Sequence, residues 1–148
     1  MRTSLTRTDR LQAALDLKGH IALQTLYLLH LRAQHEGLDQ LYFFLALLNS
    51  RLLSEYVYVL RTAYKWVQPQ IEQRVLGTLP VPLVETERQQ PIVQRAKALE
   101  RACSLAGSVV EWNQDISNLY EEQELAICAL YDAVLPGYFI DKGVIKND

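Results

Sequence analysis

The chain has 148 residues, of which 49% are hydrophobic and 22% charged, and its formal net charge at pH 7 is -2. This composition is ordinary for a globular protein and excludes disordered, collagen-like and low-complexity classes. A chain of this length can bury about two-thirds of its surface, so we expect one domain, and its net charge excludes a uniformly basic nucleic-acid wrapper.

The first third of the chain is expected to contain a small antiparallel β element. Residues 1–9 are polar and form a lead-in, and residues 10–17 fit a strand or a short helix. Gly19 indicates a turn at 18–20, because glycine accepts the positive φ of a tight reversal. Residues 20–32 alternate in a way that allows a strand, although a helix competes. The residues on its more apolar face are Ile21, Leu23, Thr25, Tyr27, Leu29 and Leu31.

Residues 38–67 form the most apolar segment, with apolar side chains around most of a helical circumference. Such a pattern predicts a central core helix. Asn49, Ser50 and Arg51 interrupt the pattern and either end a turn, bend the helix or expose one side. Pro69 closes the segment. Residues 68–87 contain three prolines and read as a connector, and residues 79–83 can be neither helix nor inner strand.

Two further helices are predicted after the connector. Over residues 88–112, apolar side chains recur at spacings of 4, 3, 4, 3 and 4, which is an a/d heptad seam. The seam consists of Ile92, Ala96, Leu99, Cys103, Ala106 and Val110. A last helix is expected over 119–135, ended by Pro136 and Gly137. The two helices would form an antiparallel pair.

The sequence offers little catalytic chemistry. The six glycines are too scattered for a phosphate-binding loop, and the histidines have no neighbours at metal-ligand spacing. Cys103 and Cys128 fit small buried hydrophobes rather than a disulfide framework. The longest apolar run, Leu41 to Leu48, is far shorter than the roughly 20 residues of a membrane span. We therefore expect a cytoplasmic protein with no enzymatic activity, cofactor or metal, and without a membrane partner.

Charge divides the chain unevenly. Residues 1–74 hold nine Lys and Arg against six Asp and Glu, a net of +3, and residues 75–148 hold six against eleven, a net of -5. This uneven charge has two interpretations. It is either chance variation on solvated faces, or the first half binds an anion such as a phosphate backbone while the second half binds a protein. Arg51, Arg61 and Lys65 interleave with tyrosines and Trp66, which suits base stacking and phosphate contact. The competing interpretation is a core helix whose long basic side chains lie on its solvent-exposed face.

Four motifs in order carry a resemblance to a known family. They are the Leu-Leu-Asn-Ser-Arg stretch ending at Arg51, the Gln-Pro-Gln-Ile stretch at 68–71, the Leu-Gly-Thr-Leu-Pro-Val-Pro stretch at 76–82, and the Gln-Gln-Pro-Ile-Val stretch at 89–93. Over roughly residues 10–135 this order resembles the TaqI-like C-terminal specificity domain of adenine-N6 DNA methyltransferases and fused restriction–modification enzymes. The last two motifs also resemble the hinge before the coiled-coil helix of type I specificity subunits. The chain has no Asn-Pro-Pro-Tyr-type catalytic motif.

The resemblance implies a DNA target-recognition module, stand-alone or truncated, that acts with a methyltransferase or restriction partner on double-stranded DNA. We expect an α+β fold, mostly α, in one domain over 10–148, with a DNA-facing part at 10–87 and a helical stalk at 88–135. Predicted DNA contacts are Lys18, Arg51, Arg61, Lys65 and Arg74, and the heptad seam is the predicted partner interface. The alternative is a helical interaction module, a homodimer or a restriction-enzyme antagonist, that does not bind DNA.

Overall fold

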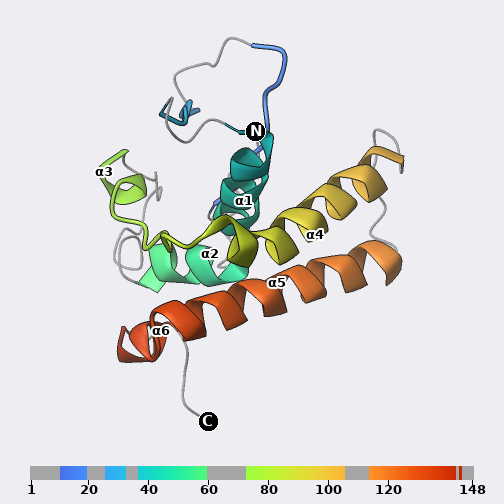
Figure 1. The fold of residues 1–148 in the computed structure, drawn as a ribbon. Coiled ribbons are helices and arrows are strands. Elements are labelled where there is room, and N and C mark those ends of the chain that lie inside the picture. Colours follow the sequence, from blue (N-terminus) through green and yellow to red (C-terminus); the bar gives the residue numbers. More distant parts are fainter. Residues whose placement is uncertain are drawn as a thin grey trace.

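The computed structural model describes residues 11–19, 26–32, 37–59, 73–105, 114–142 and 144. In these residues six helices follow one another along the chain (Figure 1). They are α1 (Leu38–Leu48), α2 (Arg51–Val57), α3 (Gln73–Leu76), α4 (Thr86–Leu105), α5 (Gln114–Val134) and α6 (Tyr138–Asp141).

The predicted α+β fold class is wrong: the described residues contain helices and irregular segments but no strand. The β element expected near 10–32 is therefore not formed in residues 11–19 and 26–32, while residues 20–25 lie outside the described part. Alternation is only a local pattern, and a strand also needs a neighbouring strand for its backbone groups. At Ala13 the backbone partner is instead a side chain, since both its N–H and its C=O bond the Asn49 amide at 2.9 Å.

The apolar segment that begins at Leu38 bends at Asn49 and Ser50, and α1 and α2 are separate helices. The Ser50 hydroxyl donates to the Leu47 carbonyl at 2.7 Å and accepts from the Leu53 N–H at 3.2 Å. Serine is favoured at this position because its oxygen satisfies a backbone donor of the first helical turn. The interruption seen in the sequence is thus a helix boundary. Residues 60–67 of the predicted helix lie outside the described part.

The two longest helices, α4 and α5, lie side by side and run in opposite directions, and α1 also packs on α4 (Figure 1). The largest fully buried side chains come from all these helices and from α2, so they form one core. They include Phe43, Leu47, Leu53, Ile92, Ile127 and Tyr131. Both long helices begin earlier than predicted, at Thr86 and Gln114, and Pro91 lies in the second turn of α4.

Residues 79–83 are not helical, as the sequence predicts, but the predicted connector of 68–87 also contains the short helix α3. The connector in the structure is the segment between α3 and α4. It is fixed to the helical pair by Tyr131, whose hydroxyl donates to the Pro80 carbonyl at 2.7 Å. Burial raises the pKa of this phenol, so it stays a neutral donor. None of the helices in the described part is long and apolar enough to cross a membrane.

Tyr131→Phe is expected to lower the free energy of unfolding by about 1 to 3 kcal/mol, because the partly buried Pro80 carbonyl loses its donor while the ring remains in place. Urea unfolding followed by circular dichroism measures the difference. Tyr27→Phe, which removes a hydroxyl from an exposed ring, is the matched control. Equal losses in the two variants would show that the Pro80 bond contributes nothing.

Candidate functional site

The predicted DNA contacts lie on separate elements. Lys18 is exposed in the turn before Gly19, whose φ of 74° confirms the expected need for glycine. The Asp16 carboxylate holds this turn by accepting the N–H groups of Lys18 and Gly19 at 3.0 Å. Arg74 is exposed on α3. Arg61 and Lys65 lie outside the described residues, so the structure does not show whether the five cations converge.

The Lys18 turn continues the segment that Asn49 holds. Besides its two bonds to Ala13, the Asn49 amide donates to the Leu45 carbonyl at 3.1 Å. The Asn49 side chain at the α1–α2 corner, together with the buried Leu11, therefore anchors residues 11–19 on the helical core. Nothing in the local sequence identifies this role, because Asn49 also fits a simple helix end.

Arg51 is the predicted contact with the most elaborate environment. Its guanidinium forms a salt bridge to Glu121 at 2.6 Å and lies over the Tyr120 ring, 4.9 Å from the centroid. About half of each charged side chain remains exposed, at 47% for Arg51 and 55% for Glu121. An exposed pair of this kind contributes about 0 to 1 kcal/mol, so a phosphate can replace Glu121 at small cost.

A buried carboxylate lies next to this pair. Glu124 accepts the backbone N–H of Arg51 with both oxygens, at 3.2 and 3.0 Å, and so satisfies a donor at the start of α2. Burial raises the pKa of the Glu124 carboxyl above its ordinary value of 4.5, and the Arg51 bonds offset only part of this effect. The carboxylate thus joins α5 to α2 at the cost of its own desolvation.

Glu124 is expected to make stability fall as pH rises from its ordinary pKa of 4.5 through its higher folded-state pKa. In that window the folded protein holds a proton that the unfolded chain has released, so raising the pH favours unfolding. Glu124→Gln removes the titration and keeps an oxygen for Arg51. The difference in unfolding free energy between wild type and variant, measured against pH, should follow this sign. A pH-independent difference would contradict the raised pKa.

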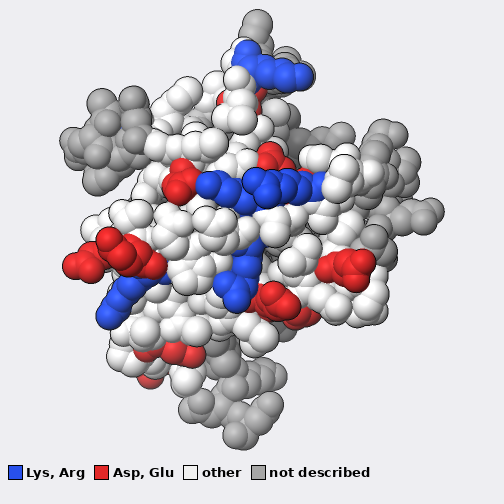
Figure 2. Space-filling view, turned by 45° about the vertical axis from the view of Figure 1, so that its right-hand side comes forward, with Lys and Arg blue, Asp and Glu red and all other residues white. Residues whose placement is uncertain are grey.

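Other cations in the described part are also close to acids. Lys97 pairs with Asp39, and Arg95 lies 4.0 Å from Glu122. Figure 2 shows Lys and Arg side chains interspersed with Asp and Glu on the visible face. This face is therefore mixed in charge, and phosphate contact there would require the cations to exchange partners.

The heptad seam faces the protein's own core at its first positions. Ile92 and Ala96 are only 1% and 5% exposed, and both belong to the hydrophobic cluster. Leu99 and Cys103 are half-buried, while Ala106 and Val110 lie outside the described residues. The helix also contacts α1 through polar groups: the Tyr42 hydroxyl donates to Glu100, and Gln90 donates to Asp39. The first two seam residues thus pack α4 against the core.

The described residues contain no group of three or more His, Cys, Asp or Glu side chains that could hold a metal ion. The organised polar side chains around Arg51 bind backbone, aromatic and carboxylate groups of the same chain. What this arrangement offers a ligand is a guanidinium held at the corner between α2 and α5, and two exposed cations, Lys18 and Arg74, on other elements.

Comparison with known proteins adds one finding. The family model of the TaqI-like C-terminal specificity domain matches residues 5–81, which is just over half of the chain and includes Lys18, the Asn49–Arg51 corner and Arg74. No curated protein and no solved structure matches the chain. The match ends within the connector, so α4 and α5 lie beyond it. On this match, the chain belongs to the TaqI-like C-terminal specificity domain family.

Proposed function

We propose that the chain is a DNA target-recognition module of a restriction–modification system, that it performs no catalytic step of its own, and that it acts with a methyltransferase partner. The family match carries this proposal. All five predicted DNA-contacting cations fall within the matched residues and within residues 1–74, the half of the chain with net positive charge.

Electrostatics give the proposed complex an orientation. Phosphate neutralisation supplies most non-specific DNA affinity, and acidic surfaces repel the duplex. The helices beyond the match, α4 and α5, belong to the half with a net charge of -5. DNA should therefore approach residues 1–74, and α4 and α5 should lie on the side of the protein that faces away from the DNA. The chain's net charge of -2 makes its own affinity for DNA weak, and the proposal therefore includes a partner that also holds DNA.

The direct test is fluorescence anisotropy of a labelled DNA duplex, titrated at several salt concentrations with and without an adenine-N6 methyltransferase subunit that lacks a specificity domain. We expect binding that weakens linearly with salt on logarithmic axes, and stronger binding with the subunit present. No binding at low salt, even with the subunit, would refute the proposal.

The salt bridge at Arg51 makes a sharper prediction. Glu121→Gln removes the carboxylate that competes with phosphate for the guanidinium, so duplex affinity should rise and the salt dependence should steepen by about one unit of slope. Arg51→Gln should have the opposite effect. A double-mutant cycle isolates the coupling: the gain from Glu121→Gln should be smaller when Arg51 is absent. Equal gains in both backgrounds would mean that Arg51 does not contact DNA.

A further inference from the structure

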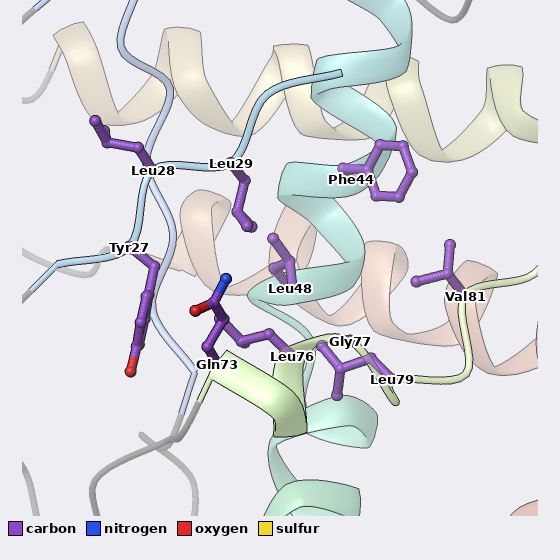
Figure 3. Close-up of a pocket in the computed structure, with 10 residues that line it drawn as sticks. All are labelled: Tyr27, Leu28, Leu29, Phe44, Leu48, Gln73, Leu76, Gly77, Leu79 and Val81. Atoms are coloured by element: carbon purple, nitrogen blue, oxygen red, sulfur yellow. The ribbon is translucent and has the colours of Figure 1, made fainter. Parts of the chain in front are cut away.

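An apolar pocket of about 330 Å³ opens beside α1 (Figure 3). Tyr27, Leu28 and Leu29 line one side, Phe44 and Leu48 come from α1, and α3 with the start of the connector closes the other side. Figure 3 shows Leu29 directed toward Leu48 and Gln73. Gln73 and the Tyr27 hydroxyl are the polar side-chain groups among the lining residues.

The side of the pocket formed by residues 26–29 continues onto the surface. Leu26, Tyr27, Leu28 and Leu29 are 53 to 59% exposed, although each is large and apolar. Single exposed leucines are common on protein surfaces, but consecutive ones next to an apolar pocket mark an interaction site. In the described part of the chain, the backbone of residues 26–32 makes no hydrogen bond to other backbone groups. The segment therefore presents an uncovered apolar surface.

Two arginines are close in sequence to residues that line the pocket. Arg32 comes three positions after Leu29, Arg74 comes directly after Gln73, and both are exposed. Among the described residues of 26–32, α1 and 73–84, the single carboxylate is Asp39. It lies at the other end of α1 from Leu48 and pairs with Lys97. An apolar pocket whose lining segments continue into exposed arginines is complementary to an apolar group flanked by carboxylates.

We propose that this pocket receives a leucine or phenylalanine side chain from an acidic segment of a partner protein. The lining favours such a side chain over a nucleobase. A base buried here would find only the Gln73 amide and the Tyr27 hydroxyl as side-chain partners for its several polar edge groups, and each group left unpaired costs about 1 to 3 kcal/mol. A leucine or phenylalanine has no such requirement and serves as a buried anchor of an interface. The inference goes beyond DNA recognition and does not depend on it.

The test uses a fluorescein-labelled peptide of sequence EELLDFLE, titrated with the full chain in the absence of DNA. Leu29→Glu and Leu28→Glu place a carboxylate at the pocket, and Leu125→Glu makes the same change at an exposed leucine, 70% accessible, on α5. The three sites are exposed, and circular dichroism checks that each variant stays folded. We expect saturable binding that weakens at least tenfold in both pocket variants and less than twofold in Leu125→Glu.

Two comparison probes complete the experiment. A peptide with Lys in place of each Asp and Glu, and one with Ser in place of each Leu and Phe, should bind at least tenfold more weakly than EELLDFLE. Equal binding of the lysine peptide, equal loss in Leu125→Glu, or no saturable binding would overturn the proposal. Displacement of EELLDFLE by a single-stranded oligonucleotide of the same length would also overturn it, because the pocket would then take a nucleotide. Because no arm of the peptide titration needs duplex binding, its result is separate from that of the proposed function.

Discussion

Leu53→Ala is expected to lower the free energy of unfolding by about 2 to 5 kcal/mol, the range for removing a buried leucine side chain. Leu53 is 0% exposed and lies in the first turn of α2, directly after the bend at Ser50. Its side chain belongs to the cluster that also contains residues of α1, α4 and α5. A cavity there would loosen the corner that positions Arg51, so the loss should be a large fraction of the stability of a domain this size.

The matched control is Leu125→Ala, the same change at a leucine that is 70% exposed on α5. This variant should stay within about 0.5 kcal/mol of wild type, because no cavity forms at an exposed site. Chemical denaturation with urea, followed by far-ultraviolet circular dichroism, measures both values. A Leu53→Ala protein that unfolds at the same urea concentration as Leu125→Ala would contradict the packing of α2 into the core.

The second large effect concerns DNA. Lys18→Gln combined with Arg74→Gln should weaken duplex binding and reduce the slope of log affinity against log salt by about two, one unit for each phosphate that is no longer neutralised. Both side chains are exposed and lie within the residues that match the specificity-domain family. Because phosphate contacts carry no sequence information, the weakening should be similar for every duplex tested.

Arg88→Gln provides the comparison for this pair, since Arg88 is exposed on α4, beyond the family match. It removes a cation from the part of the chain that we place away from DNA. Anisotropy titrations at several salt concentrations should give Arg88→Gln the wild-type slope. A larger change in Arg88→Gln than in the double variant would reverse the proposed orientation of the complex.

The sequence predicts helices better than it predicts their surroundings. The spacing from Ile92 onward correctly indicates a helix, and Asn49 and Ser50 correctly mark an interruption. These are local signals, carried by side-chain period and by a serine suited to cap a helix. The same local alternation at 20–32 led to the wrong β element, because a strand depends on a distant pairing partner that periodicity cannot reveal. The spacing of the heptad seam likewise does not reveal that Ile92 and Ala96 are buried in the core of the same chain rather than against a partner.

The candidate site was partly accessible from sequence. Gly19 predicts the turn that presents Lys18, because the required backbone conformation is local. Arg51 pairs with Glu121, and Glu124 accepts its backbone N–H, although these acids are about 70 positions away in the sequence. The residues next to Arg51 in the sequence therefore do not predict either contact. The anchoring of Ala13 by Asn49 spans 36 positions and was missed for the same reason. Charge and position identified candidate cations, but only the fold shows which of them already have partners.

Target recognition itself is tested most directly by selection from a random duplex library. The full chain, together with the methyltransferase subunit, would be used to retain bound duplexes, which are then sequenced after several rounds. Our account predicts a short shared sequence that is absent when the subunit is used alone. A retained pool as random as the starting library would contradict it, whatever the affinity.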